Sequence, residues 1–364
     1  MEEENMKYDI SITKTSEPKA KPTDESKLGF GKIFTDHMFL MDYNCEIGWT
    51  NARIVPFGPI PTNPASTVFH YGAEIFEGMK AYRAADGTIR LFRPMENINR
   101  LNASAERLCL PTVDPEGALD ILNTIVELEK DWVPKSEGTS LYIRPFLYGN
   151  DPHLGVHAVK NAVFAVICSP VGAYYAEGLN PVKIAIETED VRAVKGGTGY
   201  AKCGGNYAAS LRAGKRAEEK GYTQVLWLDG VHRKYIEEVG AMNVMFKIDG
   251  KIVTPELTGS VLPGITRKSC IELLRDWGYT VEERLISVDE LFEAAANGKL
   301  EEAWGTGTAA VVSPIGHLFY NGKEYEVTGN QIGSLTQRLY DELTGIQWGK
   351  QADAYGWSVK VCDA

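Results

Sequence analysis

The stretch Gly199-Tyr200-Ala201-Lys202-Cys203-Gly204-Gly205-Asn206-Tyr207 places one lysine in a glycine-rich turn just before a predicted helix. Glycine permits the tight backbone that such a turn requires. A lysine held there inside a cleft would be partly desolvated, which lowers its pKa and makes its amine available for a Schiff base. Most lone lysines are solvated instead, so these residues alone leave both interpretations of Lys202 open.

The length of the chain indicates two domains with a cleft between them. Its 364 residues exceed one ordinary core, and the 44% hydrophobic and 24% charged contents are typical of a folded protein. Turn-forming residues interrupt the regular pattern between Pro170 and Pro181. We therefore predict a loosely ordered N-terminal arm at residues 1–27, a small first domain at 28–170, an interdomain loop at 171–183 and a large second domain at 184–364.

Periodicity predicts an α/β architecture in the first half. Pro94 opens a helix with an apolar stripe, and Asp114-Pro115 is a good cap and first-turn pair for a second helix. Both helices need a sheet to cover. Strands at 140–148 and 162–168 would supply it.

The second half mixes strands and helices in the same way. We predict a strand at 182–187, a helix at about 207–220 and a long strand at 235–248. Asp249-Gly250 then signals a hairpin. A later helix is predicted from the capping box that begins at Ser287.

Charge and composition exclude several classes of partner. A net charge of -11 argues against nucleic acid, because phosphate binding needs clustered Lys and Arg. We find neither an apolar run long enough to span a membrane nor a signal peptide. The six cysteines form no C-x-x-C pair, which indicates reduced thiols in the cytoplasm and no metal site.

One motif imitates a dinucleotide-binding loop. The segment Gly305-Thr306-Gly307-Thr308-Ala309-Ala310 has the G-x-G-x-x-A form, which would suggest a nucleotide-binding oxidoreductase. However, Val311-Val312-Ser313-Pro314 follows where a helix should begin, so the required context is missing. A non-catalytic interaction protein is a further alternative, and it would make the setting of Lys202 accidental.

Three other fragments have both an ordinary and a functional interpretation. Adjacent Glu237 and Glu238 face opposite sides of a strand, so one can point inward and pair with a protonated pyridine nitrogen, or both can lie in water on an edge strand. The helix start near Thr266 can hold a phosphate or be a common junction. Arg100 can be a solvated side chain or a phosphate clamp.

Several longer motifs occur in a definite order along the chain. They are Phe34-Thr35-Asp36-His37-Met38, Phe76-Glu77-Gly78-Met79-Lys80, Leu91-Phe92-Arg93-Pro94, Tyr142-Ile143-Arg144-Pro145, Lys202-Cys203-Gly204-Gly205-Asn206-Tyr207 and Glu238-Val239-Gly240-Ala241-Met242-Asn243. From Phe30 to about Val361 the chain resembles the class IV aminotransferases, and specifically the branched-chain amino acid aminotransferases.

This resemblance implies a fold and an activity. The fold would be the pyridoxal-phosphate (PLP) fold type IV, a homodimer whose subunits each have two α/β domains, with the cofactor in the interdomain cleft. The reaction would be a reversible ping-pong transfer of the amino group from L-leucine, L-isoleucine or L-valine to 2-oxoglutarate. Within the same class, a D-amino-acid aminotransferase or an aminodeoxychorismate lyase remains an alternative.

The resemblance also implies roles for individual residues around the cofactor. Lys202 would carry PLP as a Schiff base, Glu238 would bind the pyridine nitrogen, Tyr207 would contact the ring hydroxyl and Leu262 would pack on the ring. The phosphate would be held by Arg100, by the amides of Ile265 and Thr266, and by Thr308.

The substrate would meet a second set of residues. Its side chain would lie near Phe30, Phe76, Tyr207 and Ala241, with Tyr71 and Val156 reaching in from the partner subunit. Its carboxylate would be held by Tyr142 and the backbone at Thr308 and Ala309, and the distal carboxylate of glutamate by Arg144. Two departures from relatives stand out, since Ala241 replaces a threonine of some members and Ala310 and Ser313 replace the C-x-x-C of mammalian members. We therefore predict no redox switch there.

Overall fold

A computed structural model describes residues 7–172 and 179–364. These residues form two compact units, each described here by itself. The first unit contains residues 7–172, 201–204 and 345–364, and the second contains 179–200 and 205–344. Residues 345–364, which the sequence analysis assigns to the second domain, thus group with the first unit. Part of the predicted arm (1–6) and part of the predicted interdomain loop (173–178) lie outside the described residues.

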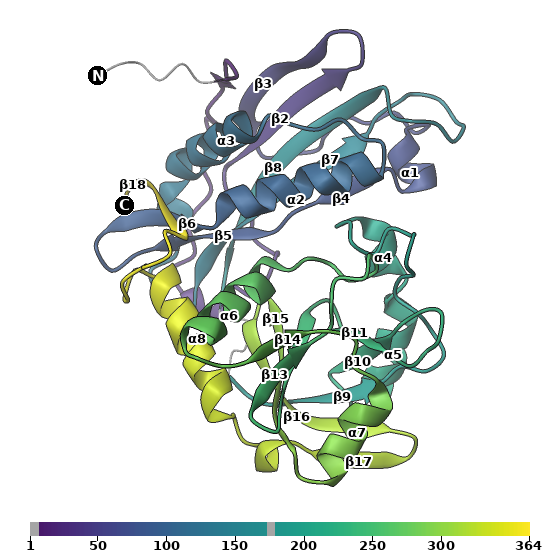
Figure 1. The fold of residues 1–364 in the computed structure, drawn as a ribbon. Helices are drawn as coiled ribbons and strands as arrows, with labels where there is room; N and C mark the ends of the chain where they lie inside the picture. The colour runs from purple at the N-terminus through teal and green to yellow at the C-terminus, as the bar shows by residue number, and fades with distance from the viewer. Residues whose placement is uncertain (1–6, 173–178) are drawn as a thin grey trace. The chain divides into compact units, whose positions relative to one another are not determined.

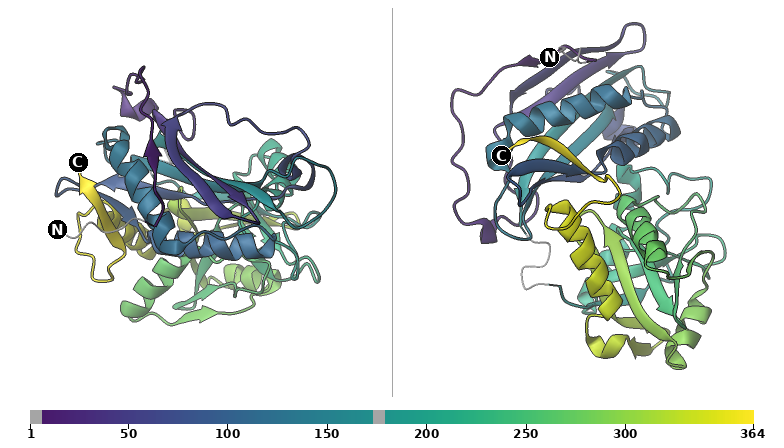
Figure 2. Two further views of the ribbon diagram at one scale, coloured as in Figure 1. Left: turned by 90° about the horizontal axis from the view of Figure 1, so that it is seen from above. Right: turned by 60° about the vertical axis from the view of Figure 1, so that its left-hand side comes forward.

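The first unit is built on a mostly antiparallel sheet (Figure 1). Its strands are β1 (Ser11–Ile12), β2 (His37–Asn44), β3 (Gly48–Pro56), β4 (Glu74–Phe76), β5 (Met79–Arg83), β6 (Thr88–Phe92), β7 (Ser140–Gly149), β8 (Asn161–Val171) and β18 (Ser358–Asp363). The order is β1-β3-β2-β8-β7-β5-β6-β18, with β4 also paired to β7. The C-terminal strand β18, yellow in Figure 2, pairs with β6 although the two are far apart in sequence.

Two helices cover one face of this sheet (Figure 1). They are α2 (Pro94–Arg107) and α3 (Pro115–Leu128), and the unit also has α1 (Thr67–Tyr71) and the short 3-10 helices η1 (Glu25–Lys27) and η2 (Lys130–Trp132). Both predicted helix starts are confirmed, since proline occupies the first turn of each and Asp114 caps α3 by accepting from the Gly117 amide. Buried Ile98 and Ile125 join the core between the helices and the sheet.

Successive side chains of β7 point to opposite faces of the sheet. Along β7, Leu141 and Ile143 point into the core under α2 and α3. Because successive strand residues face opposite sides, Tyr142 and Arg144 lie on the other face. The sheet register therefore brings two of the predicted substrate-binding residues to the face that the helices leave uncovered.

The N-terminal arm is more ordered than the sequence indicates. Ser11–Ile12 pairs with β3 as a parallel edge strand, and the Lys19 amide donates to Asp36 at 2.8 Å. Backbone hydrogen bonds of this kind need no apolar periodicity, which is why a pattern search finds no structure in residues 7–27.

The second unit contains a mixed sheet of its own. Its strands are β9 (Val182–Ile186), β10 (Gln224–Leu228), β11 (Ile236–Val239), β12 (Asn243–Ile248), β13 (Lys251–Thr254), β14 (Val281–Glu283), β15 (Leu300–Gly307), β16 (Val311–Tyr320) and β17 (Lys323–Glu326). The order is β11-β10-β9-β16-β15-β12-β13-β14, with β17 on β16. Its helical segments are α4 (Gly204–Ala208), α5 (Leu211–Glu219), α6 (Ile265–Asp276), α7 (Val288–Ala296), η3 (Thr328–Asn330) and α8 (Ser334–Gln347).

Several predicted elements of the second unit are confirmed and two need correction. The hairpin at Asp249-Gly250 joins β12 to β13, and both turn residues have positive φ. The predicted helix at 207–220 is wrong in one respect, because it divides into α4 and α5. The predicted long strand at 235–248 is also wrong, because Gly240 at φ 57° turns the chain between β11 and β12.

The turn at Gly305 is also clarified by the structure. Gly305 and Gly307 lie in β15, which pairs directly with β16 as an antiparallel hairpin. No helix follows the glycines, so the dinucleotide-loop interpretation is wrong. A Cβ at Gly305 would lie 2.9 Å from the terminal methyl of Met242, so the methionine side chain would have to shift.

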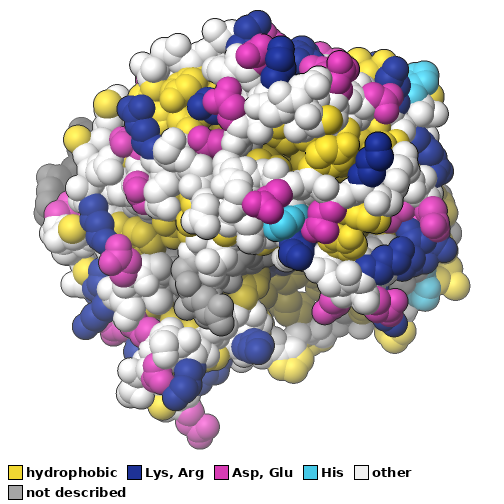
Figure 3. All heavy atoms as spheres, turned by 90° about the horizontal axis from the view of Figure 1, so that it is seen from below, with side chains coloured by type: hydrophobic (Ala, Val, Ile, Leu, Met, Phe, Trp, Pro, Cys, Tyr) yellow, Lys and Arg dark blue, Asp and Glu magenta, His cyan; other side chains and the backbone are white. Residues whose placement is uncertain are grey.

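Charged side chains of both signs are spread over the surface. On the face drawn in Figure 3, basic and acidic side chains are interspersed, and no large area is basic alone. None of the helices in the described part of the chain combines the length and apolar character that a membrane span needs. All six cysteines are free thiols, of which Cys168, Cys203 and Cys270 are buried.

Candidate active site

Lys202 is held by its backbone within the first unit. Its amide donates to Ser104 Oγ of α2 at 2.9 Å, and its carbonyl accepts from the Phe76 amide at 2.9 Å. Its Nζ lies 5.0 Å from the centre of the Phe76 ring. Burial, reinforced by the positive charge of Arg100, lowers the pKa of Lys202 to about 8. The Lys202 side chain is thus half-buried and not fully solvated.

Arg100 forms a buried ion pair that the sequence does not reveal. Its Nε and one terminal nitrogen donate to the two carboxylate oxygens of Glu77 at 2.7 and 2.9 Å. Asn97, one turn earlier on α2, also donates to Glu77 at 2.8 Å. Although burial acts to raise it, the Arg100 guanidinium holds the pKa of Glu77 below its usual range. Arg100 is thus a rigid, desolvated cation, and its solvated interpretation is wrong.

An aromatic group lies on the uncovered face of the sheet in the first unit. The Arg144 guanidinium donates to Tyr142 Oη at 3.0 Å and lies 4.6 Å from the Phe76 ring centre. Phe30 meets the Tyr142 ring edge-on, with centroids 4.9 Å apart. A Cβ at Gly78 would collide with Tyr142 Oη, so glycine is needed there for this tyrosine position. The aromatic faces contribute to stabilising the charge of the guanidinium.

Two further predicted substrate residues stand on the surface of the first unit. Val156 is 87% exposed and Tyr71 is 42% exposed. Tyr71 Oη accepts from the Gly155 amide at 2.8 Å, which links α1 to the loop between β7 and β8. Both side chains are therefore accessible to another molecule.

Glu238 is the centre of a polar network in the second unit. It is 3% exposed and forms an ion pair with Arg192, with Nε and Oε2 2.6 Å apart. It also accepts from Asn243 Nδ2 and from the Leu262 amide, both at 3.2 Å. The edge-strand interpretation of two water-exposed carboxylates is wrong, because Glu237 is also buried and accepts from Ser260. Sequence reasoning missed Arg192, which no motif singles out.

The start of α6 offers free hydrogen-bond donors. Gly264 caps this helix without any side-chain acceptor, so the first amides, at Ile265 and Thr266, have no side-chain cap. A Cβ at Gly264 would collide with Asn243 Oδ1, which ties this helix start to the network around Glu238. Backbone N–H groups and the helix dipole together favour an anion at this position.

The remaining predicted residues of the second unit lie on turns and on a short helix. Thr308 and Ala309 form the turn between β15 and β16, and Ala241 is exposed in the turn after Gly240. Tyr207 lies on α4 and is partly exposed. Near the β15–β16 turn, Thr306 Oγ1 is buried without a hydrogen-bond partner. An orphaned hydroxyl at this turn is a group that a bound ligand can satisfy.

The family follows from comparison with known proteins. Residues 74–318 match the family described as Amino-transferase class IV, so the chain belongs to the class IV aminotransferases. The predicted family is therefore confirmed. Branched-chain-amino-acid aminotransferase 2 of Bacillus subtilis (strain 168) is 54% identical over 355 residues, which cover 98% of this chain and 98% of that relative. Branched-chain-amino-acid aminotransferase of Mycolicibacterium smegmatis is 45% identical, over 97% of this chain and 98% of that relative.

Solved structures with the same fold carry related names. A branched-chain amino acid aminotransferase from the organism abbreviated T.th., solved with pyridoxamine 5'-phosphate, aligns with a TM-score of 0.75 at 28% identity, over 91% of this chain and 100% of that one. The enzyme from Escherichia coli aligns with a TM-score of 0.72 at 26% identity, over 90% and 99% of the two chains. The predicted mixed α/β fold of this class is thereby confirmed.

Proposed function

We propose that this protein is a PLP-dependent branched-chain amino acid aminotransferase, which transfers the amino group of L-leucine, L-isoleucine or L-valine to 2-oxoglutarate. The observation that carries the proposal is the 54% identity over nearly all of the chain to a relative with this name. The test is a coupled assay of L-leucine with 2-oxoglutarate. D-leucine in the same assay distinguishes an L-specific from a D-specific enzyme, and no transfer from either amino acid would contradict the proposal.

Each unit carries donors whose chemistry suits a phosphorylated pyridine aldehyde. In the first unit, Lys202 supplies an amine that loses its proton readily, and Arg100 supplies a buried cation. In the second, Glu238 would hold the ring nitrogen, Tyr207 the ring hydroxyl and Leu262 the ring face. The phosphate would be held by the amides of Ile265 and Thr266 and by Thr308, with the unpaired hydroxyl of Thr306 as a further donor.

The cofactor, when bound, supplies an electron sink for charge that develops at the substrate Cα. The chain supplies the proton chemistry. Glu238, fixed by Arg192 and Asn243, keeps a proton on the ring nitrogen through a charge-assisted hydrogen bond, which contributes about 1.5–3 kcal/mol. Lys202 Nζ would remove the proton from the substrate Cα and would deliver it to the carbon that comes from the cofactor's aldehyde group. A pKa near 8 lets one amine serve as base and then as acid.

The lowered pKa of Lys202 predicts how cofactor-free protein takes up PLP. Only the neutral amine attacks an aldehyde, so the rate of recombination should rise with pH along a titration curve centred near pH 8, the pKa that burial gives Lys202. At pH 8, less than about 1% of an unperturbed lysine, with a pKa near 10.4, would be neutral. Stopped-flow absorbance measures the rate, and a curve centred near pH 10 would contradict the prediction.

Replacing Arg144 should affect glutamate and leucine differently as amino donors. Arg144 would meet the distal carboxylate of glutamate, whereas with leucine bound its charge is satisfied by Tyr142 and the Phe76 ring. Loss of a charge-assisted contact of about 1.5–3 kcal/mol predicts that Arg144→Gln lowers kcat/KM for glutamate roughly 10- to 100-fold. The value for leucine should change much less. Single-turnover kinetics with each amino acid measure the two effects, and equal losses would exclude this role.

The assembly and location of the enzyme belong to the same proposal. We infer a homodimer in which Tyr71 and Val156 of each subunit reach the substrate pocket of the other, for which both side chains are accessible in the single chain. A cytoplasmic location and a functional division into domains at 28–170 and 184–364 are proposed with it. Light scattering should give the mass of two chains, and a monomer with full activity would contradict the shared pocket.

A further inference from the structure

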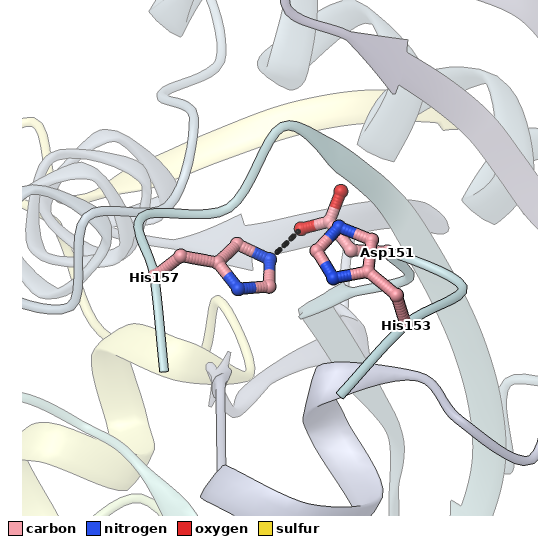
Figure 4. Close-up of side chains that lie close together, drawn as sticks. All are labelled: Asp151, His153 and His157. Carbon is pink, nitrogen blue, oxygen red and sulfur yellow. Dashed lines mark hydrogen bonds and ion pairs between the residues drawn. The ribbon is translucent and has the colours of Figure 1, made fainter. Parts of the chain in front are cut away.

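The loop between β7 and β8 gathers three side chains that can ligate a metal ion. Asp151 lies at its start, and His153 and His157 follow (Figure 4). Their ligand atoms all lie within 4.8 Å of one another. Within the described part of the chain, this is the one group of three or more His, Cys, Asp or Glu residues that comes together in this way. None of its members has a role in the proposed transamination.

The spacing of these atoms fits a tetrahedral site. His157 Nε2 and Asp151 Oδ2 are 3.2 Å apart. Two ligands of a tetrahedral zinc ion, each about 2.0–2.1 Å from the metal, are about 3.3 Å from each other. The ligand atom of His153 lies within 4.8 Å of the other two, and this side chain is exposed, so it can turn toward them when an ion binds. Two imidazoles and a carboxylate are a donor set that suits zinc and the neighbouring divalent transition metals.

Asp151 is held in place by the surrounding backbone. Its side chain is fully buried, and it accepts from the amide of Lys160 at 3.0 Å and from the amide and side chain of Asn161, both at 2.9 Å. Hydrogen bonds of this kind orient a ligating carboxylate before any metal arrives. The carboxylate therefore does not depend on His157 for its position.

The histidine rings stack in the metal-free chain. They lie face to face, with centroids 4.5 Å apart and planes inclined by 23°, so one ring must turn before both can direct a nitrogen at the same ion. His153 Nδ1 lies 3.3 Å from the carbonyl oxygen of Leu154. A proton on that nitrogen leaves Nε2 as an acceptor, and histidine ligands of metals are commonly oriented by such a contact.

We propose that Asp151, His153 and His157 bind a divalent transition-metal ion of the zinc class, with water in the fourth position. The ion connects His153 to His157 and so joins the two ends of the loop segment 153–157. Within this segment the side chains of Leu154 and Val156 are 63% and 87% exposed. The ion thereby stiffens the segment that presents Val156. An effect of this stiffening on the partner's substrate pocket rests on the proposed function. Metal binding itself does not rest on it.

Equilibrium dialysis of the purified holoenzyme against ZnCl2, followed by elemental analysis, tests the proposal. We expect wild-type protein to retain one more zinc ion per chain than a His153→Ala/His157→Ala variant. His153→Ala alone should weaken that site by more than about tenfold. His153 is exposed, so this single variant keeps the test valid if the double variant folds poorly. Magnesium should not compete, because it prefers a full set of oxygen ligands.

His232→Ala is the matched control, because His232 is an exposed histidine of the second unit and is not a member of the Asp151 group. It should retain the same zinc as the wild type. Zinc held by the exposed thiols of Cys45 and Cys109 or by the cofactor is common to all variants and cancels in the difference. Equal zinc in the wild type and both histidine variants would overturn the proposal, whatever the outcome of the leucine assay.

Hydrogen exchange gives an independent readout of the same site. Zinc should slow amide exchange at residues 153–159 in the wild-type holoenzyme and leave it unchanged in His153→Ala. Slowed exchange in both proteins would place the metal elsewhere and contradict the assignment.

Discussion

Replacing Lys202 with alanine should lower kcat for transfer from L-leucine to 2-oxoglutarate by at least about a thousandfold, within the range that positioned acid–base groups contribute. The reason is that one amine serves both to bind the cofactor and to move the Cα proton. The measurement is the steady-state rate with saturating PLP, so that weaker cofactor binding does not imitate a loss of proton transfer. A variant that retained the wild-type rate would refute the role of Lys202 directly.

Lys80 provides a matched control for this experiment. It is buried in the first unit, and burial lowers its pKa to about 8, as it does that of the half-buried Lys202. A depressed pKa therefore does not by itself identify the lysine that binds PLP. Borohydride reduction of the holoenzyme followed by peptide mapping should find the phosphopyridoxyl group on Lys202 and none on Lys80. Lys80→Met should keep the cofactor, and labelling of Lys80 would contradict the assignment.

Glu238→Gln should lower kcat roughly 10- to 100-fold, because a neutral amide cannot hold a charged ring nitrogen through a bond worth about 1.5–3 kcal/mol. The change should also destabilise the protein, since it leaves Arg192 buried without its counter-ion. Removal of one partner of a buried pair typically costs about 3–5 kcal/mol. Denaturant unfolding of the holoenzyme measures this second effect separately from the rate.

The neighbouring Glu237 provides a control for Glu238. Replacing it shows whether kcat falls when any buried carboxylate of β11 is changed. Both carboxylates are buried on β11, but Glu237 accepts from Ser260 and burial raises its pKa. Glu237→Gln keeps the hydrogen bond to Ser260, so its kcat should stay close to that of the wild type. Glu238→Asp should recover part of the lost rate, because it restores the charge. Equal losses in Glu238→Gln and Glu237→Gln would show that the charge on Glu238 has no special role.

Local signals in the sequence predicted much of the fold because their causes are local. Proline in the first turn and an aspartate cap set the starts of α2 and α3, and the side chain of Ser287 accepts from the Glu290 amide at the start of α7. Asp249-Gly250 likewise determined a hairpin through its positive φ angles. At Gly240 the same kind of reasoning failed, because nothing in the neighbouring residues indicates that the strand must turn there.

The sequence by itself determined the family, through ordered motifs such as those around Lys202 and Glu238. It could not determine the partners of buried charges, because ion pairs such as Arg100 with Glu77 and Arg192 with Glu238 join residues far apart in the chain. It also missed the Asp151 group, which depends on the path of one loop. Local backbone preferences act over a few residues and can be read along the chain, whereas desolvation and charge pairing arise only when the fold brings distant residues together.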